Sequence, residues 1–202
     1  MTPATATSQK IIDLLQESLQ LKQVILKDHG LIQTVAAVAA ELRRSLRDGG
    51  KIFFFGNGGS AADAQHLAAE LVGRFDRERR ALPAIALTAN TSTMTAIGND
   101  YSYDRVFVRQ LEALSTPGDI AVGISTSGKS PNVVNAVRSA REAGVTTVGM
   151  TGLSGGELAS LAHFCIRIPS ERTPRIQEAH ILIGHILCEL VEEDLSNDGY
   201  IS

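Results

Sequence analysis

Apolar residues recur every three or four positions before Gly49 and again near the C-terminus. This spacing is typical of helices with one apolar face, and it predicts two amphipathic helices before Gly49 and one long helix from Thr173 to Leu195. Gly49 and Gly50 end the second helix, because glycine accepts the backbone conformation in which helices commonly stop. Together the three helices carry more apolar surface than one flank of a sheet needs, which indicates a subunit interface.

Between these helices, short apolar runs alternate with helical stretches, and the runs cover residues 51–55, 84–88, 120–124, 146–150 and 164–168. Strands that are apolar throughout are covered on both faces, and alternation with helices is typical of a parallel sheet. The sequence therefore predicts a single α/β unit over residues 1–202. We expect a three-layer αβα sandwich with a five-stranded parallel sheet over 49–170, N-terminal helices over 1–48 and a C-terminal helix over 171–195.

The first candidate binding loop follows the run at 51–55 and consists of Gly56, Asn57, Gly58, Gly59 and Ser60. In an open parallel sheet, ligands bind where the carboxyl ends of strands lead into helices. The glycines let a ligand approach the backbone, and the next helix points free N–H groups toward it. A tight strand-to-helix turn also favours glycine, so ligand binding and simple turn geometry are equal alternatives for this loop.

The second candidate loop follows the run at 120–124 and is rich in hydroxyl groups, from Ser125, Thr126, Ser127 and Ser130. At a helix N-terminus, such hydroxyls and the helix dipole form a cradle for phosphate from neutral donors. The alternative explanation, a helix cap, needs only one hydroxyl. The loop therefore favours phosphate binding.

This loop also permits a nucleotide triphosphatase as an alternative. Residues 123–130 form G-I-S-T-S-G-K-S, which matches the pattern G-x-x-x-x-G-K-[ST]. Such an enzyme would use Lys129 on the phosphates and Ser130 on Mg²⁺, with an Asp at the end of a second strand. The runs that end at Met150 and Ile168 are not followed by that carboxylate. The nucleotidase is therefore the minor alternative.

A third group of residues has metal-binding chemistry. His66 and Glu70 are four residues apart on the helix after the first loop, so both project from one face. Gln177, His180 and His185 lie among apolar residues of the C-terminal helix. Imidazole and carboxylate groups suit Zn²⁺, with further ligands from another element. Spacing alone is weak support, because exposed His/Glu pairs are common and a lone His on an apolar face is usually a core residue.

The charge of the chain limits its partners. The formal net charge of -3 provides no general attraction to nucleic acid or to anionic membranes. No apolar run approaches the ~18 residues that span a bilayer, and the N-terminal segment lacks the apolar stretch of a secretory signal. We therefore expect a cytoplasmic protein with neither nucleic acid nor membrane as a partner.

Four segments resemble, in order and spacing, the bacterial phosphoheptose isomerases of the sugar isomerase (SIS) superfamily: GNGGSAADAQHLAAEL, TAIGNDY, GISTSGKSPN and RIQEAHILIGHIL. The resemblance extends from Gly49 to Glu192. It implies a flavodoxin-like SIS domain and a homotetramer with active sites near subunit interfaces. It also implies aldose-ketose isomerisation of a sugar phosphate, D-sedoheptulose 7-phosphate, to D-glycero-D-manno-heptose 7-phosphate.

The resemblance further implies roles for individual residues. One Zn²⁺ per subunit would be bound by His66, Glu70, Gln177 and His185, and Glu70 and His185 would also be the acid–base pair. The substrate would contact Asn57, Gly58, Gly59, Ser60, Glu70, Asn99, Asp100, Ser125, Thr126, Ser127, Ser130 and Gln177. These residue types suit the reaction, because moving a proton between C1 and C2 through an enediol requires a carboxylate base and an acid for the oxygens.

The spacing of Gln177 and His185 conflicts with a shared metal ion. On one straight helix they lie about 12 Å apart along the axis and about 80° around it. We therefore expect that the site is assembled between subunits or that Gln177 binds loosely. His180 is an alternative ligand, because it shares a helix face with Gln177.

A non-catalytic alternative comes from relatives in the same superfamily that bind the replication initiator. Those relatives resemble the isomerases but lack the acid–base positions. Glu70 and His185 are both present in this chain. Their presence favours the enzyme.

Overall fold

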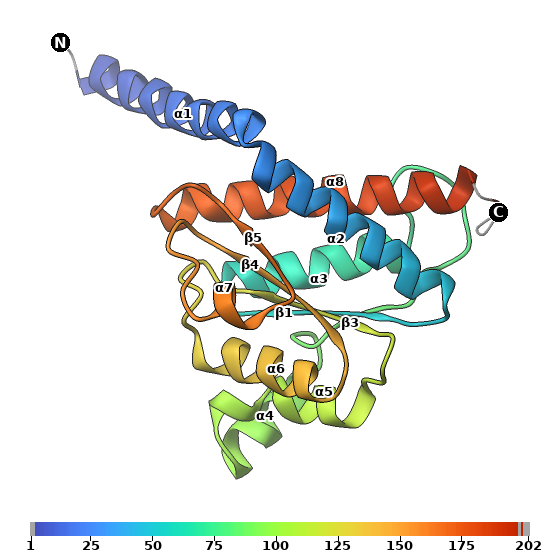
Figure 1. Cartoon of the computed structure of the whole chain (residues 1–202). Helices are drawn as coiled ribbons and strands as arrows, with labels where there is room; N and C mark the ends of the chain where they lie inside the picture. Colours follow the sequence, from blue (N-terminus) through green and yellow to red (C-terminus); the bar gives the residue numbers. More distant parts are fainter. Residues whose placement is uncertain (1–2, 198, 200–202) are drawn as a thin grey trace.

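A computed structural model describes residues 3–197 and 199 (Figure 1). Its centre is a sheet of five parallel strands in the order β2-β1-β3-β4-β5. The strands are β1 (Ile52–Gly56), β2 (Ala84–Ala86), β3 (Ile120–Ile124), β4 (Thr146–Thr151) and β5 (Phe164–Arg167). Each lies within or within one residue of one of the five predicted apolar runs, so the predicted parallel sheet is confirmed.

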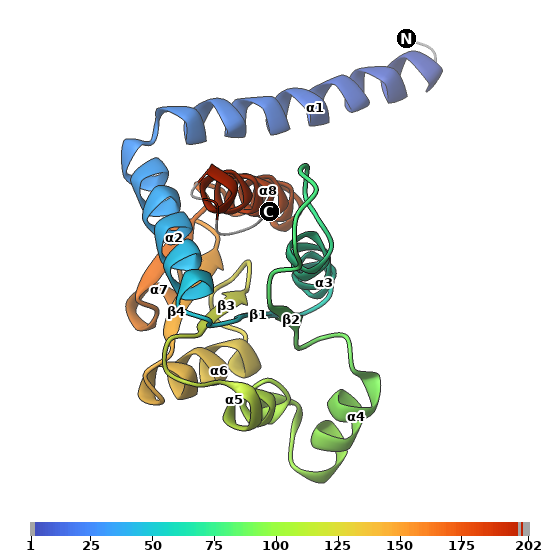
Figure 2. The same ribbon diagram turned by 90° about the vertical axis from the view of Figure 1, so that its right-hand side faces the viewer.

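Helices cover both faces of the sheet, as the predicted αβα sandwich requires (Figures 1 and 2). Helices α2, α3 and α8 lie on one face, and α5 and α6 lie on the other. The helices are α1 (Pro3–Lys27), α2 (His29–Arg47), α3 (Gly59–Val72), α4 (Thr91–Asp100), the 3-10 helix η1 (Tyr103–Arg105), α5 (Val108–Leu114), α6 (Pro131–Glu142), α7 (Leu158–Leu161) and α8 (Thr173–Asn197).

The central strands are apolar throughout because both faces are covered. Every residue of β1 and β3 is buried. Side chains alternate along a strand, so Ile52 and Phe54 pack toward α2, α3 and α8, whereas Phe53 and Phe55 pack toward α5 and α6. The sheet thus separates two apolar cores, and its carboxyl edge is left for the loops.

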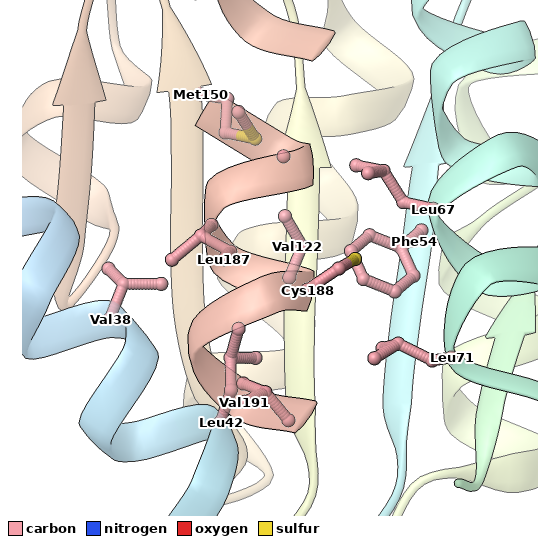
Figure 3. A pocket seen from close by; sticks show the side chains of 11 residues that line it. Val38, Leu42, Phe54, Leu67, Leu71, Val122, Met150, Leu187, Cys188 and Val191 are labelled. Atoms are coloured by element: carbon pink, nitrogen blue, oxygen red, sulfur yellow. The ribbon is translucent and has the colours of Figure 1, made fainter. Parts of the chain in front are cut away.

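Helices α3 and α8 approach each other closely at Gly184. A Cβ atom at this position would lie 2.6 Å from a methyl carbon of Leu67, so with any larger residue the Leu67 side chain or the helix itself would have to shift. Both residues border a small apolar cavity between these helices and the sheet, which Phe54 and Cys188 also line (Figure 3). Because His66 and His185 are the neighbours of Leu67 and Gly184 in the sequence, this contact also brings the two imidazoles together.

Helix α1 extends beyond the sandwich, across the end of α8 (Figure 2). It carries exposed large apolar side chains at Ile11, Ile12, Leu15, Leu19, Val24 and Leu26. In the parts of the chain that the structure describes, no helix has the length and apolar character needed to cross a membrane. The described residues leave this apolar surface of α1 exposed.

Candidate active site

The two candidate loops meet at the carboxyl edge of the sheet. Strands β1 and β3 are hydrogen-bonded neighbours, and the chain leaves them toward opposite faces, into α3 and α6. Asn57 of the first loop and Asn132 of α6 exchange two side-chain hydrogen bonds of 2.9 and 2.8 Å. The reversal of strand order at this point creates the crevice in which such sheets bind ligands.

Two residues at this crevice were not among the predicted site residues. Asn132 joins the loops through its side chain, and the hydroxyl of Tyr103 donates a hydrogen bond of 3.3 Å to Oδ1 of Asn57. Asn132 ends the segment GISTSGKSPN, so a sequence signal existed for it. No sequence signal pointed to Tyr103, because its contact with Asn57 depends on where η1 packs.

The hydroxyl-rich loop holds its side chains together. Oγ of Ser125 lies 2.9 Å from Oγ of Ser130 and 3.4 Å from Oγ of Ser127. Ser130 is the N-cap residue of α6, but its side chain makes no capping hydrogen bond. The helix-cap explanation for these hydroxyls therefore does not account for Ser130. The arrangement can present hydroxyl groups and the α6 N-terminus to an anion.

His66 and Glu70 of α3 meet His185 of α8. Nε2 of His66 lies 3.2 Å from Oε1 of Glu70 and 2.8 Å from Nε2 of His185. One ligand atom from each residue lies within 4.8 Å of the other two. Tetrahedral ligands at ~2.0–2.1 Å from one zinc ion would be about 3.3 Å apart. The donor set and its spacing therefore fit a divalent metal.

Two further residues surround this cluster. The ring centroid of Phe75 lies 5.5 Å from that of His185. Asp63 lies one turn before His66, and its Oδ2 atom is buried with no hydrogen-bond partner among the described residues. Burial raises the pKa of Asp63, and the nearby His66 and His185 partly oppose this. The i, i+3 spacing of Asp63 and His66 is a signal in the sequence that the two residues share one helix face.

Three predicted residues lie elsewhere. The Gln177 amide lies against Gly59 at the start of α3, where a Cβ atom on the glycine would be 2.5 Å from Nε2 of Gln177. Its role as a metal ligand therefore stays a prediction. Asn99 and Asp100 are exposed at the end of α4, where the Asn99 amide donates a hydrogen bond to Oδ1 of Asp100. Their role in substrate binding also stays a prediction.

His180, the alternative metal ligand, is not part of the cluster formed by His66, Glu70 and His185. Its side chain is buried, and Nε2 lies 3.2 Å from the carbonyl oxygen of Thr151 at the end of β4. Burial lowers the pKa of His180 to about 4, and the hydrogen bond to Thr151 opposes this only partly. His180 is thus a neutral core residue, with Nε2 assigned as the donor from its partner.

This burial predicts a pH dependence of stability. An unfolded histidine, with a pKa of about 6.5, binds its proton before the folded one does. The stabilisation is therefore complete above that value and is lost as the pH falls toward the folded pKa of about 4. Between pH 7 and pH 5 we expect a decrease of about 2 kcal/mol in the free energy of unfolding from this residue.

Urea unfolding at both pH values would measure this decrease. In His180→Gln the decrease in the free energy of unfolding between the two pH values should be smaller by about 2 kcal/mol. In His29→Gln, a change at an exposed position, the decrease should equal that of the wild type. An equal pH dependence in wild type and His180→Gln would contradict the assignment.

Comparison with known proteins identifies relatives that match most of the chain. The SIS domain family matches residues 16–152. A phosphoheptose isomerase from Aquifex aeolicus is 52% identical over 185 residues, which cover 92% of this chain and 96% of the relative. One from Nitratidesulfovibrio vulgaris is 57% identical over 161 residues, which cover 80% and 77%.

Comparison with solved structures finds members of the same family. The structure of a phosphoheptose isomerase from Neisseria gonorrhoeae has a TM-score of 0.87 and 42% identity, and the match covers 93% of this chain and 99% of that one. The structure from Francisella tularensis has a TM-score of 0.88 and 36% identity, and covers 93% and 98%. The similarity thus extends over nearly the whole chain.

Proposed function

Because the chain belongs to the phosphoheptose isomerases of the SIS domain family, we propose how its residues carry out the reaction. The protein is an aldose-ketose isomerase that interconverts D-sedoheptulose 7-phosphate and D-glycero-D-manno-heptose 7-phosphate. The named relatives do not favour the nucleotidase or the initiator-binding protein. The observation that carries the proposal is the convergence of His66, Glu70 and His185.

Glu70 is the base that moves the proton between C1 and C2. It is half-buried, and its carboxylate lies beside two imidazoles from different helices. His185 is the acid that exchanges a proton with the sugar oxygens, because its Nε2 atom faces the same point as the carboxylate. The two groups then act on adjacent atoms of one substrate.

We propose Zn²⁺ as the metal at this cluster, bound by His66, Glu70 and His185, with Gln177 as a weaker contact. Its chemistry there would be to polarise the carbonyl and the adjacent hydroxyl. A carboxylate shared with an ion is a weaker base, so we expect its bond to Glu70 to be weak. The contact of Gln177 with Gly59 supports a role for this amide in substrate binding.

The sugar phosphate spans the crevice from this cluster to the hydroxyl-rich loop. Ser125, Ser127 and Ser130 donate to the phosphate oxygens, together with the free N–H groups of α6. Asn57 and Gly59 contact the sugar from the first loop. Asn99 and Asp100 complete the predicted substrate contacts.

We further propose a cytoplasmic homotetramer with active sites near subunit interfaces. The exposed apolar side chains of α1 support it, because exposed apolar patches mark surfaces that bind other proteins. A groove between α1 and α8 is lined by Leu15 and Leu182 and reaches His185. A second subunit in this groove would lie beside the acid–base residues.

An isomerase assay tests the reaction and the metal together. Turnover of sedoheptulose 7-phosphate should decrease at least about tenfold after chelation and return with added Zn²⁺. The same assay after addition of Mg²⁺ alone is the control, because Mg²⁺ prefers oxygen ligands. Undiminished turnover in the metal-free protein would contradict the metal role, whereas absence of turnover under every condition would contradict the reaction.

A further inference from the structure

A buried ion pair joins the segment after α3 to helix α8. Nε of Arg79 lies 2.7 Å from Oε1 of Glu192, and the side chains are 0% and 2% exposed. A buried ion pair costs much of its attraction in lost hydration, so stability alone is a weak reason for one. The backbone groups that Arg79 and Glu192 bind indicate a role other than stability.

Arg79 binds the end of helix α3. Its Nη2 atom donates to the carbonyl oxygen of Glu70 at 2.9 Å, and Nη1 donates to the carbonyl oxygens of Leu71 at 2.9 Å and Gly73 at 3.3 Å. Carbonyls in the last turn of a helix lack partners within the helix, and a cation there also complements the helix dipole. Arg79 therefore fixes the backbone of the residue that carries the proposed base.

Glu192 binds the segment that follows α3. Its carboxylate accepts hydrogen bonds from the backbone N–H groups of Phe75, Asp76 and Arg77 at 3.0, 2.8 and 2.8 Å. Burial raises the pKa of Glu192, but these bonds and Arg79 outweigh it and hold the pKa below its ordinary value. The carboxylate is thus charged and fully used in holding this segment, which lies beside α8 (Figure 2).

The held segment reaches the cluster through Phe75, whose ring lies against His185 with a centroid distance of 5.5 Å. His185 itself lies about two helical turns before Glu192 on α8. The pair therefore contacts the backbone of Glu70 on α3, and it also holds the ring that packs against His185.

We propose that Arg79 and Glu192 are positioning residues, which hold α3 and α8 at the spacing that brings Glu70 and His185 to one reacting centre. Neither touches substrate or metal. The inference rests on the proposed function of the cluster. Displacing a reacting group by about 1 Å can cost about a hundredfold in rate, so variants of the pair should lose kcat even where they stay folded.

The chain offers closely matched controls for this pair. Arg77 and Glu193 form an ion pair of 3.4 Å between the same segment and the same helix, but their side chains are 45% and 49% exposed. The test variants are Arg79→Lys and Glu192→Gln, and the controls are Arg77→Lys and Glu193→Gln. Lysine keeps the charge of Arg79 but lacks the planar fork that reaches Glu192 and the α3 carbonyls together.

The readouts are kcat, KM, the melting temperature and the affinity of the chelated, full-length protein for Zn²⁺ by titration. In the test variants we expect kcat to fall about a hundredfold with KM changed less than about threefold, and Zn²⁺ affinity to fall about 10–100-fold. The controls should keep wild-type values. Folded test variants with wild-type kcat and Zn²⁺ affinity would overturn the proposal.

Phe75→Leu provides a second test if the pair proves necessary for folding. It leaves both charges and all backbone bonds in place and removes only the ring against His185. We expect a fall in kcat with little change in melting temperature, and unchanged kcat would overturn the link to His185. A wild-type protein without isomerase activity would contradict the proposed function instead, and Zn²⁺ affinity would then still decide whether the pair positions the cluster.

Discussion

Replacing Glu70 by glutamine should lower kcat about 10²–10⁴-fold, which is the usual contribution of a general base. Glutamine has nearly the same shape but cannot accept the proton from the sugar carbon. Because Glu70 lies two residues before the end of α3 and its side chain is only half-buried, the fold should be retained. Turnover of sedoheptulose 7-phosphate at saturating Zn²⁺ measures the effect, and circular dichroism checks the fold.

Glu189→Gln is the matched control, because Glu189 is exposed on α8, four residues after His185. It changes the net charge equally and should leave kcat unaltered. The amide is also a weaker metal ligand, so the bound zinc must be quantified in both variants. Full turnover in Glu70→Gln would remove the proposed mechanism while leaving the fold and family unaffected.

Replacing Gly128 by alanine should disrupt the hydroxyl-rich loop. Gly128 has φ of +65°, and a Cβ atom there would lie 2.0 Å from the carbonyl oxygen of Gly155 and 2.8 Å from Oγ1 of Thr151. The clash is with backbone, so the loop itself must move. We expect a loss of about 2–5 kcal/mol of stability, from left-handed strain plus overpacking, and a rise in KM of at least about tenfold as phosphate contacts are lost.

Gly49→Ala separates backbone strain from overpacking as causes of the lost stability. Gly49 also has positive φ, of +83°, but a Cβ atom there would have no atom within 4 Å, so only backbone strain of about 1–2 kcal/mol applies. Urea unfolding and KM for the sugar phosphate should be measured for both variants. Equal losses of stability in the two, or an unchanged KM in Gly128→Ala, would show that the loop tolerates displacement.

Much of the fold could be predicted because its elements depend on local patterns. The five apolar runs became strands because both faces of the sheet are covered, and the long amphipathic stretches became α1, α2 and α8. The hydroxyl-rich loop was recognised because its residues are consecutive. The pairing of His66 with Glu70 was likewise predictable, because a helix brings positions four apart to one face.

The choice between His180 and His185 shows where the pattern was insufficient. The two lie five residues apart on α8, about 140° apart around its axis, so only one can face α3. Both have apolar neighbours in the sequence. Tertiary packing determines which histidine faces α3. His180 faces β4, where its Nε2 atom lies beside the Thr151 carbonyl, whereas His185 faces the end of α3.

By itself, the sequence determined the strands, the helices, the two loops and two of the three residues of the candidate metal cluster, because each depends on residues close together in the chain. Only the tertiary structure decided that Asn57 meets Asn132 and that Arg79 reaches both Glu70 and Glu192. It also places His185, which the family resemblance implied as a ligand, beside His66 and Glu70. These contacts join residues from different elements. They depend on the order of strands and on how closely Gly184 lets two helices approach, which no local pattern specifies.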